Sequence, residues 1–145
     1  MSNQPTNFEQ TVLQMMLSGE ISELKILREQ LSKAIVSKRE FTGHGFFTDF
    51  SIPADAPRLQ RKTRITITDV SVEFPTLKHG AGFVLFIDEG EMSCLEGFCY
   101  DEAWPDSTDG FALSYLKRLS PGSPSLIPSK ERDVEFAFKD FAAKV

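Results

Sequence analysis

The carboxylate best placed to do chemistry in this sequence is Glu96, which lies in a segment rich in apolar residues. The pattern of residues 91–100 predicts a strand, and one face of its hairpin would hold Glu96 together with Val84, Phe86, Met92, Cys94 and Phe98. A carboxylate among apolar groups is partly desolvated, which raises its pKa. A carboxyl group with a raised pKa can act as a general acid or base. In the alternative interpretation, Glu96 meets an arginine or a backbone donor and is structural.

A histidine between two glycines is the second candidate. His44 lies between Gly43 and Gly45, and two phenylalanines follow. Glycine lets the backbone approach a ligand closely, and histidine titrates near neutral pH. The alternative is a mobile turn that needs glycine only for its backbone angles. A phosphate-binding loop is not indicated, because the lysine and the helix start of that motif are missing.

An aromatic and acidic loop follows the second strand of the hairpin. Tyr100, Asp101, Glu102 and Trp104 come directly after the strand, and Pro105 stiffens the turn. Loops held by a rigid strand often carry binding residues, and tyrosine and tryptophan are favoured interface anchors. Alternatively, Trp104 folds back as a lid on the core. The candidates for binding a ligand or partner are therefore His44, Glu96, Tyr100, Asp101 and Trp104.

No pattern in the sequence assigns a catalytic residue, a metal site or a cofactor. Ser93 lies in mid-strand without a nucleophile elbow. Cys94 and Cys99 fall on opposite faces of the predicted strand, so we expect free, inert thiols. The two histidines, His44 and His79, show no metal-ligand spacing with the cysteines.

The charge balance narrows the choice of partners. The net charge of −5 repels phosphate backbones, so we expect no nucleic-acid partner. A basic cluster, Arg58, Arg61, Lys62 and Arg64, is interpreted as a solvated turn and strand edge. No apolar run approaches the ~20 residues that cross a bilayer, and the first ten residues do not resemble a signal peptide. We therefore expect a cytoplasmic protein without membrane contact.

The hydrophobic periodicity predicts an α+β fold, with two N-terminal helices packed on a mostly antiparallel sheet of five or six strands. The helices are expected near residues 8–16 and 20–34, and the clearest strand at 63–74. Asp49 and Asp69 have polar neighbours and are expected at the surface. Residues 1–119 would form a single domain, residues 120–129 a Pro/Ser-rich linker, and residues 130–145 a segment docked on the domain. That last segment fits either a strand or a short helix, and we favour the helix.

Residues 83–87 and 91–100 are predicted to pair as a hairpin that is apolar on both faces. The loop Asp88-Glu89-Gly90 fits a three-residue connection with a bulge. This places Phe86 opposite Met92. A strand that is apolar on both sides must be covered on both sides. Helices would cover one face, and a second copy of the chain the other, so we predict a homodimer.

Several motifs together resemble a group of small uncharacterised bacterial hypothetical proteins. These motifs are GHGFFTDF at 43–50, GAGFVLF at 80–86, and LEGF, YDE and WP between 95 and 105. The resemblance extends from about residue 24 to residue 119. It implies one domain that ends near residue 119. It implies no activity, because none is assigned to the group.

Two functional hypotheses remain open on the sequence. The first is a non-catalytic binding module, for example one that neutralises a basic protein partner as an immunity protein neutralises a toxin nuclease. Charge complementarity would speed that encounter. The alternative is a small enzyme or ligand sensor that uses Glu96 with His44 and Tyr100, which requires these three groups to meet in one pocket.

Overall fold

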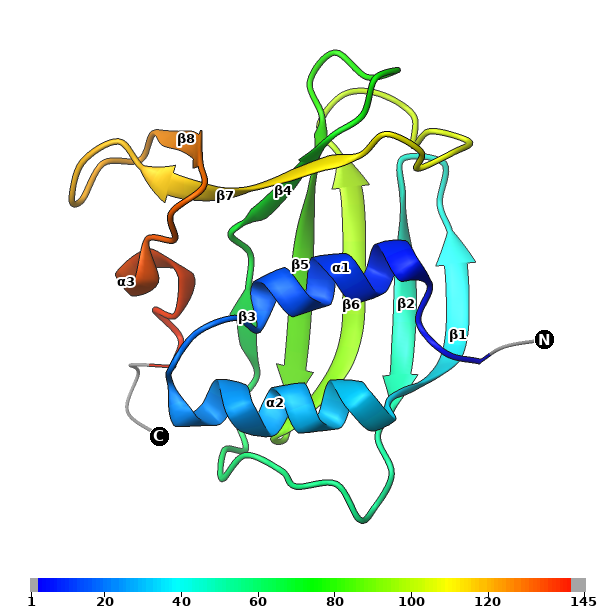
Figure 1. Ribbon diagram of the computed structural model, residues 1–145, viewed down its shortest axis with the longest axis vertical. Coiled ribbons are helices and arrows are strands. Elements are labelled where there is room, and N and C mark those ends of the chain that lie inside the picture. Colours follow the sequence, from blue (N-terminus) through cyan, green and yellow to red (C-terminus); the bar gives the residue numbers. More distant parts are fainter. Residues whose placement is uncertain (1–2, 142–145) are drawn as a thin grey trace.

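The computed structural model describes residues 3–141, and it confirms the α+β class. The strands within these residues form one antiparallel sheet of eight strands, in the order β1-β2-β6-β5-β4-β7-β8 with β3 also paired to β5 (Figure 1). The elements are α1 (Asn7–Met16), α2 (Ser22–Lys33), β1 (Ile35–Phe41), β2 (Gly45–Ser51), β3 (Ile65–Ile67), β4 (Val70–Glu73), β5 (Ala81–Asp88), β6 (Glu91–Cys99), β7 (Ala112–Arg118), β8 (Leu126–Ser129) and α3 (Val134–Ala137). No helix in the described part of the chain is long and apolar enough to cross a membrane.

The sheet is larger than the five or six strands predicted, for two reasons. The expected strand at 63–74 is divided at Thr68 and Asp69 into β3 and β4. In addition, β8 forms within residues 120–129, which we expected to be a linker, and it pairs with β7. The C-terminal segment contains the short helix α3, and its last residues, 142–145, lie outside the described part.

All three helices bury their apolar sides in the same core. Thr6 caps α1, because its hydroxyl accepts the Glu9 N–H while the Glu9 carboxylate accepts the Thr6 N–H. Figure 1 shows α1 and α2 lying across one face of the sheet. The apolar residues that they bury against this face include Val12, Leu13, Met16, Leu24 and Leu27. Ala137, Phe138 and Phe141, in and after α3, join this cluster.

Asp69 is not at the surface, so that prediction is wrong. Its side chain is 0% exposed and forms a double ion pair with Arg132, whose Nε and Nη2 atoms lie 2.9 and 2.8 Å from the carboxylate oxygens. The break between β3 and β4 shifts the alternation by one residue, so Val70 and Val72 are buried like Ile65 and Ile67. The partner is 63 residues away along the chain, beyond the reach of any local pattern.

The β5–β6 turn also differs from its prediction. The connection has two residues, Glu89 and Gly90, with φ of 49° and 82°. Two consecutive positive φ angles are typical of a type I′ turn. The extra residue lies at Ser93 instead, between the pairs Ile87↔Met92 and Phe86↔Cys94. As a result Met92 is fully buried on the helix side, away from the face that holds Glu96.

The two faces of this central hairpin have different surroundings. The helix-facing side chains of β5 and β6, such as Phe83, Leu85 and Leu95, are fully buried. Those on the opposite face, which include Phe47, Val84, Phe86 and Phe98, are only half-buried, and the described helices do not pack there. The homodimer stays a prediction, and this outer face is the surface on which it would form.

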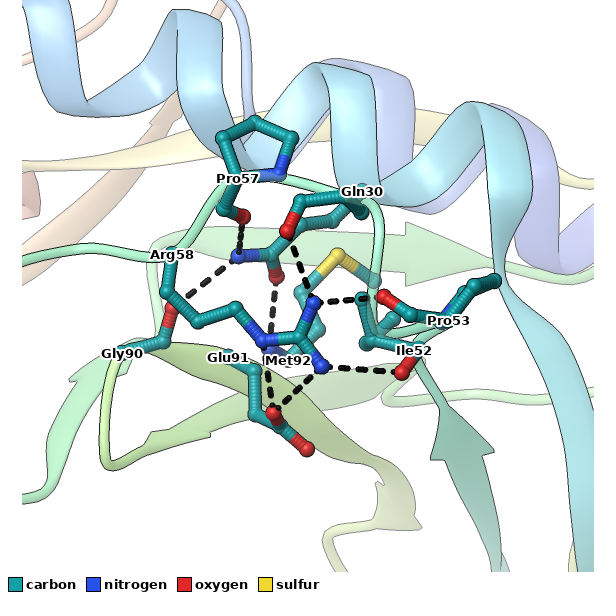
Figure 2. A network of polar contacts seen from close by, with 9 residues as sticks. Gln30, Ile52, Pro53, Pro57, Arg58, Gly90, Glu91 and Met92 are labelled. Carbon is teal, nitrogen blue, oxygen red and sulfur yellow. Dashed lines mark hydrogen bonds and ion pairs between the residues drawn. The ribbon is translucent and has the colours of Figure 1, made fainter.

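A closed polar network fixes the end of the sheet at the β5–β6 turn (Figure 2). Gln30 of α2 is 0% exposed, and its Nε2 donates to the carbonyls of Pro57 and Gly90 at 2.8 and 2.9 Å. Its Oε1 accepts the Met92 N–H at 2.9 Å. Arg58 donates to three carbonyls of residues 52–56 and pairs with Glu91 at 2.9 Å.

The basic cluster around Arg58 is therefore not simply a solvated edge. Arg58 holds the loop before β3, and Arg61 is largely buried against Glu23 at 2.7 Å. Arg64 pairs with Asp88 at 2.6 Å. Each of the three arginines therefore has an acidic partner, whereas Lys62 is exposed.

Candidate functional site

A cleft of about 810 Å³ opens at the other end of the sheet, near the β1–β2 turn. It lies between the N-terminal part of α1, the ends of β1 and β2, and residues 104–111 before β7. These elements meet at the upper right of Figure 1. The cleft has the size of a small-ligand or side-chain pocket.

Five aromatic side chains form the walls: Phe8, Phe41, Phe46, Trp104 and Phe111. Four of these rings are packed edge to face, with centroids 4.9 Å apart for Phe8 and Phe111 and 5.0 Å apart for Phe46 and Trp104, whereas Phe41 is tilted against Phe46. Such aromatic pairs stabilise the packing of the walls by about 0.5–1.5 kcal/mol each. Phe41 differs from the others, because 68% of its surface is exposed. It offers a free aromatic face at the mouth of the cleft.

The floor holds a buried ion pair. Glu9 is 3% exposed, and its carboxylate accepts hydrogen bonds from Arg39 Nη2 (2.7 Å), Arg39 Nε (3.1 Å), Thr48 Oγ1 (2.6 Å) and the Thr6 N–H (2.8 Å). Burial alone would raise the pKa of Glu9, but the hydrogen bonds from Arg39, Thr48 and Thr6 outweigh it and lower the pKa overall. Glu9 therefore stays ionised and neutralises Arg39.

Two acidic side chains lie on the rim without a counterion. Asp106 and Asp109 line the cleft and are exposed, and neither carboxylate has an ion-pair or hydrogen-bond partner among residues 3–141. Of the described residues that line the cleft, only Arg39 is basic, and Glu9 cancels its charge. The charged side chains that line the cleft therefore carry a net negative charge.

Trp104 is the one predicted binding residue that lines this cleft. Its role in binding stays a prediction, and the structure shows where its ring lies. Its ring packs on Phe46, Phe74 and Phe83, as a lid on the core would, and it also forms a wall of the cleft. Its backbone N–H donates to Gly43 O at 2.9 Å, which ties the 104 loop to the β1–β2 turn.

His44, Tyr100 and Asp101 lie around the same end of the sheet but outside the cleft lining. His44 is exposed, with Nδ1 at 3.3 Å from Glu102 O. Tyr100 is half exposed and packs edge to face on Phe98. Asp101 bonds to His79 Nδ1 at 2.7 Å.

Glu96 lies elsewhere, on the outer face of the sheet. It pairs with Phe47 on one side and Val84 on the other, and burial raises its pKa. Within residues 3–141, no hydrogen bond or ion pair joins Glu96 to His44 or Tyr100. None of these three residues lines the cleft, and the enzyme alternative that combines them stays a prediction.

The cysteines also contribute no nucleophile. Both are free. Burial, with a smaller effect from Asp49, raises the pKa of Cys94 to about 12, and burial also raises the pKa of Cys99. Because the thiolate is the reactive form, neither sulfur is activated near neutral pH.

Sequence reasoning missed Glu9 and Arg39. The Thr6–Glu9 spacing is a readable capping box, but it gives no sign that the same carboxylate also holds a strand residue. Arg39 lies 30 residues further along the chain and reaches Glu9 only when α1 docks on β1 and β2. Comparison with known proteins adds nothing to this picture, because no family model, no curated protein and no solved structure matches the chain.

Proposed function

We propose that the protein is a non-catalytic binding module whose cleft receives a basic side chain of a partner protein. The observation that carries this proposal is the combination of aromatic walls with an uncompensated acidic rim. Asp106 and Asp109 stand beside five aromatic rings, and the basic group of the floor is already neutralised.

The walls suit the shape and charge of a lysine or arginine. A cation over an aromatic face gains about 0.5–2 kcal/mol, most over tryptophan. The long apolar stems of these side chains pack against rings while the charged head stays near water. A stem between Phe41 and Trp104 would leave its head group within the field of the rim acids.

The net charge of −5 supports the same partner class. An acidic protein attracts a basic partner over long range and raises the rate of encounter, in a manner that salt suppresses. Neutralisation of a basic protein, as by an immunity protein, is the concrete form of this function that we favour.

The single tryptophan of the chain makes the proposal directly testable. Trp104 lines the cleft, so its fluorescence reports occupancy of the cleft without a label. Titration with a hexa-arginine peptide at low salt should change Trp104 emission saturably. Phe41→Ala should weaken binding by roughly tenfold, the value of one cation–π contact. The double variant Asp106→Asn/Asp109→Asn should weaken it at least as much.

A matched pair of variants separates the cleft from net charge. Glu89→Gln/Glu131→Gln removes the same two negative charges from exposed positions outside the cleft lining. This control should bind nearly as well as the wild type. Equal loss in both double variants, or no saturable change in Trp104 emission, would contradict the proposal.

A further inference from the structure

Three side chains lie close together where β5 begins and β6 ends, namely those of His79, Asp101 and Glu102. The proposed function does not use them. A ring nitrogen of His79 and one carboxylate oxygen each from Asp101 and Glu102 all lie within 4.8 Å of one another. His79 Nδ1 is 2.7 and 2.9 Å from the two oxygens of Asp101. His79 precedes β5, and the two acids follow β6.

The register of the hairpin brings these residues together. Ala81 pairs with Cys99 in the last step of the β5–β6 ladder. Continuing the same register two residues further places His79 opposite Asp101. His79 and Asp101 therefore lie close together because of the pairing of β5 with β6, and not because of an independent contact between two loops.

The loop that carries His79 is held in place. The Glu102 carboxylate accepts the N–H groups of Lys78 (3.0 Å) and His79 (3.2 Å). Gly80 follows with φ of 68°, and a Cβ at this position would lie 2.5 Å from Val72 O, so the loop is pressed against β4. A donor set anchored on a hairpin end keeps its geometry better than one on a free loop.

We propose that His79, Asp101 and Glu102 form a binding site for a divalent transition metal ion of the zinc class. Zinc binds histidine nitrogen and carboxylate oxygen at about 2.0–2.2 Å, which sets neighbouring ligand atoms roughly 3–4 Å apart. A small movement of the exposed His79 and Asp101 side chains toward the partly buried Glu102 therefore closes the site. The imidazole favours zinc, nickel or cobalt over magnesium and calcium, which prefer oxygen ligands alone.

Three protein ligands leave a fourth position for water or for a group of a partner. On binding, the His79 nitrogen that ligates must be unprotonated, so any proton held there passes to solvent as the nitrogen lone pair takes the metal. Trp104 follows two residues after Glu102, so a bound ion would also brace the loop that walls the cleft. The metal site itself does not depend on the function proposed for the cleft.

The chain has two histidines, and they supply a matched control. His44 is also exposed and also near Glu102, but its Nδ1 faces the backbone carbonyl at 3.3 Å and not the carboxylate. Metal-free protein is titrated with Zn²⁺ by calorimetry and with Co²⁺ by visible absorption. His79→Gln should weaken binding by more than about tenfold, whereas His44→Gln should leave it within twofold of the wild type.

The acids complete the test. Asp101→Asn should reproduce the loss seen in His79→Gln, while Glu89→Gln should not, although it also removes one exposed negative charge from an end of the same hairpin. Far-ultraviolet circular dichroism checks that each variant folds, which the exposure of these side chains favours. The proposal is overturned if the wild type binds neither ion saturably, or if His44→Gln weakens binding as much as His79→Gln.

Discussion

The two ends of the sheet treat buried polar groups in different ways. At the β5–β6 turn, the fully buried Gln30 side chain satisfies two carbonyls and one N–H (Figure 2). At the β1–β2 turn, Glu9 also accepts several hydrogen bonds, but its partner Arg39 lines an open cleft. The Gln30 network stabilises the fold at a closed end of the sheet. The Glu9–Arg39 pair lies under an open surface where a ligand can replace water.

The difference predicts unequal costs for removing one polar side chain. Gln30→Ala leaves the Met92 N–H without its acceptor and takes a donor from two carbonyls, of which the Gly90 carbonyl is in a buried bond and the Pro57 carbonyl in a partly buried one. We expect the free energy of unfolding to fall by about 2–4 kcal/mol. Urea denaturation measures this, with the exposed Gln60→Ala as control, which should stay within about 0.5 kcal/mol of the wild type. A loss below about 1 kcal/mol for Gln30→Ala would show that water reaches this end too.

Much of the fold is predicted by local sequence patterns, whereas the pairing at the β5–β6 turn is not. The 3.6-residue period at Phe8, Val12 and Met16 predicts α1, and alternation from Phe46 to Ile52 predicts β2, because both report burial on one side of a regular element. The register of the β5–β6 hairpin depends on a bulge at Ser93 that no local pattern marks. With the predicted register, His79 would not face Asp101, so the sequence did not predict that His79, Asp101 and Glu102 lie together.

The candidate site was predictable only in part for the same reason. Trp104 and the glycine-flanked turn before Phe46 stand out by residue type and do meet at the cleft. The Glu9–Arg39 pair and the Asp69–Arg132 pair depend on how distant segments dock. Single-sequence reasoning identifies elements well and their relative placement poorly.

At the β1–β2 end of the sheet, removing the buried carboxylate of Glu9 should lower the free energy of unfolding less than Gln30→Ala does. Glu9→Gln keeps a side-chain acceptor for the Thr6 N–H but leaves Arg39 without its counterion. Because Arg39 lines the cleft, water can solvate the guanidinium, and we expect a loss of about 1–2 kcal/mol in the same denaturation assay. A loss equal to or larger than that of Gln30→Ala would mean that the cleft is dry, and the contrast between the two ends would fail.

The two ends of the sheet should also differ in how their contributions to the free energy of unfolding depend on pH. The folded-state pKa of Glu9 lies below its ordinary value of 4.5. Its stabilising contribution is therefore complete above about pH 4.5 and is lost as the pH falls through the folded-state pKa. The difference in unfolding free energy between wild type and Glu9→Gln should shrink between pH 5 and pH 3, whereas the effect of Gln30→Ala, which involves no titrating group, should not change. A difference for Glu9→Gln that stays constant over this range would contradict the assignment.

The smallest effect on stability is expected at Phe41, where the effect on binding is large. Its ring is 68% exposed and lies 6.5 Å from Phe46 between centroids, so truncation to alanine exposes little new apolar surface. We expect the unfolding free energy of Phe41→Ala to remain within about 0.5 kcal/mol of the wild type, although hexa-arginine binding drops roughly tenfold. Leu119→Ala, an equally exposed apolar position outside the cleft lining, should change neither quantity. If Phe41→Ala destabilises the protein by more than 1 kcal/mol, the ring belongs to the core. The open end would then be a structural cluster like its counterpart at the β5–β6 turn.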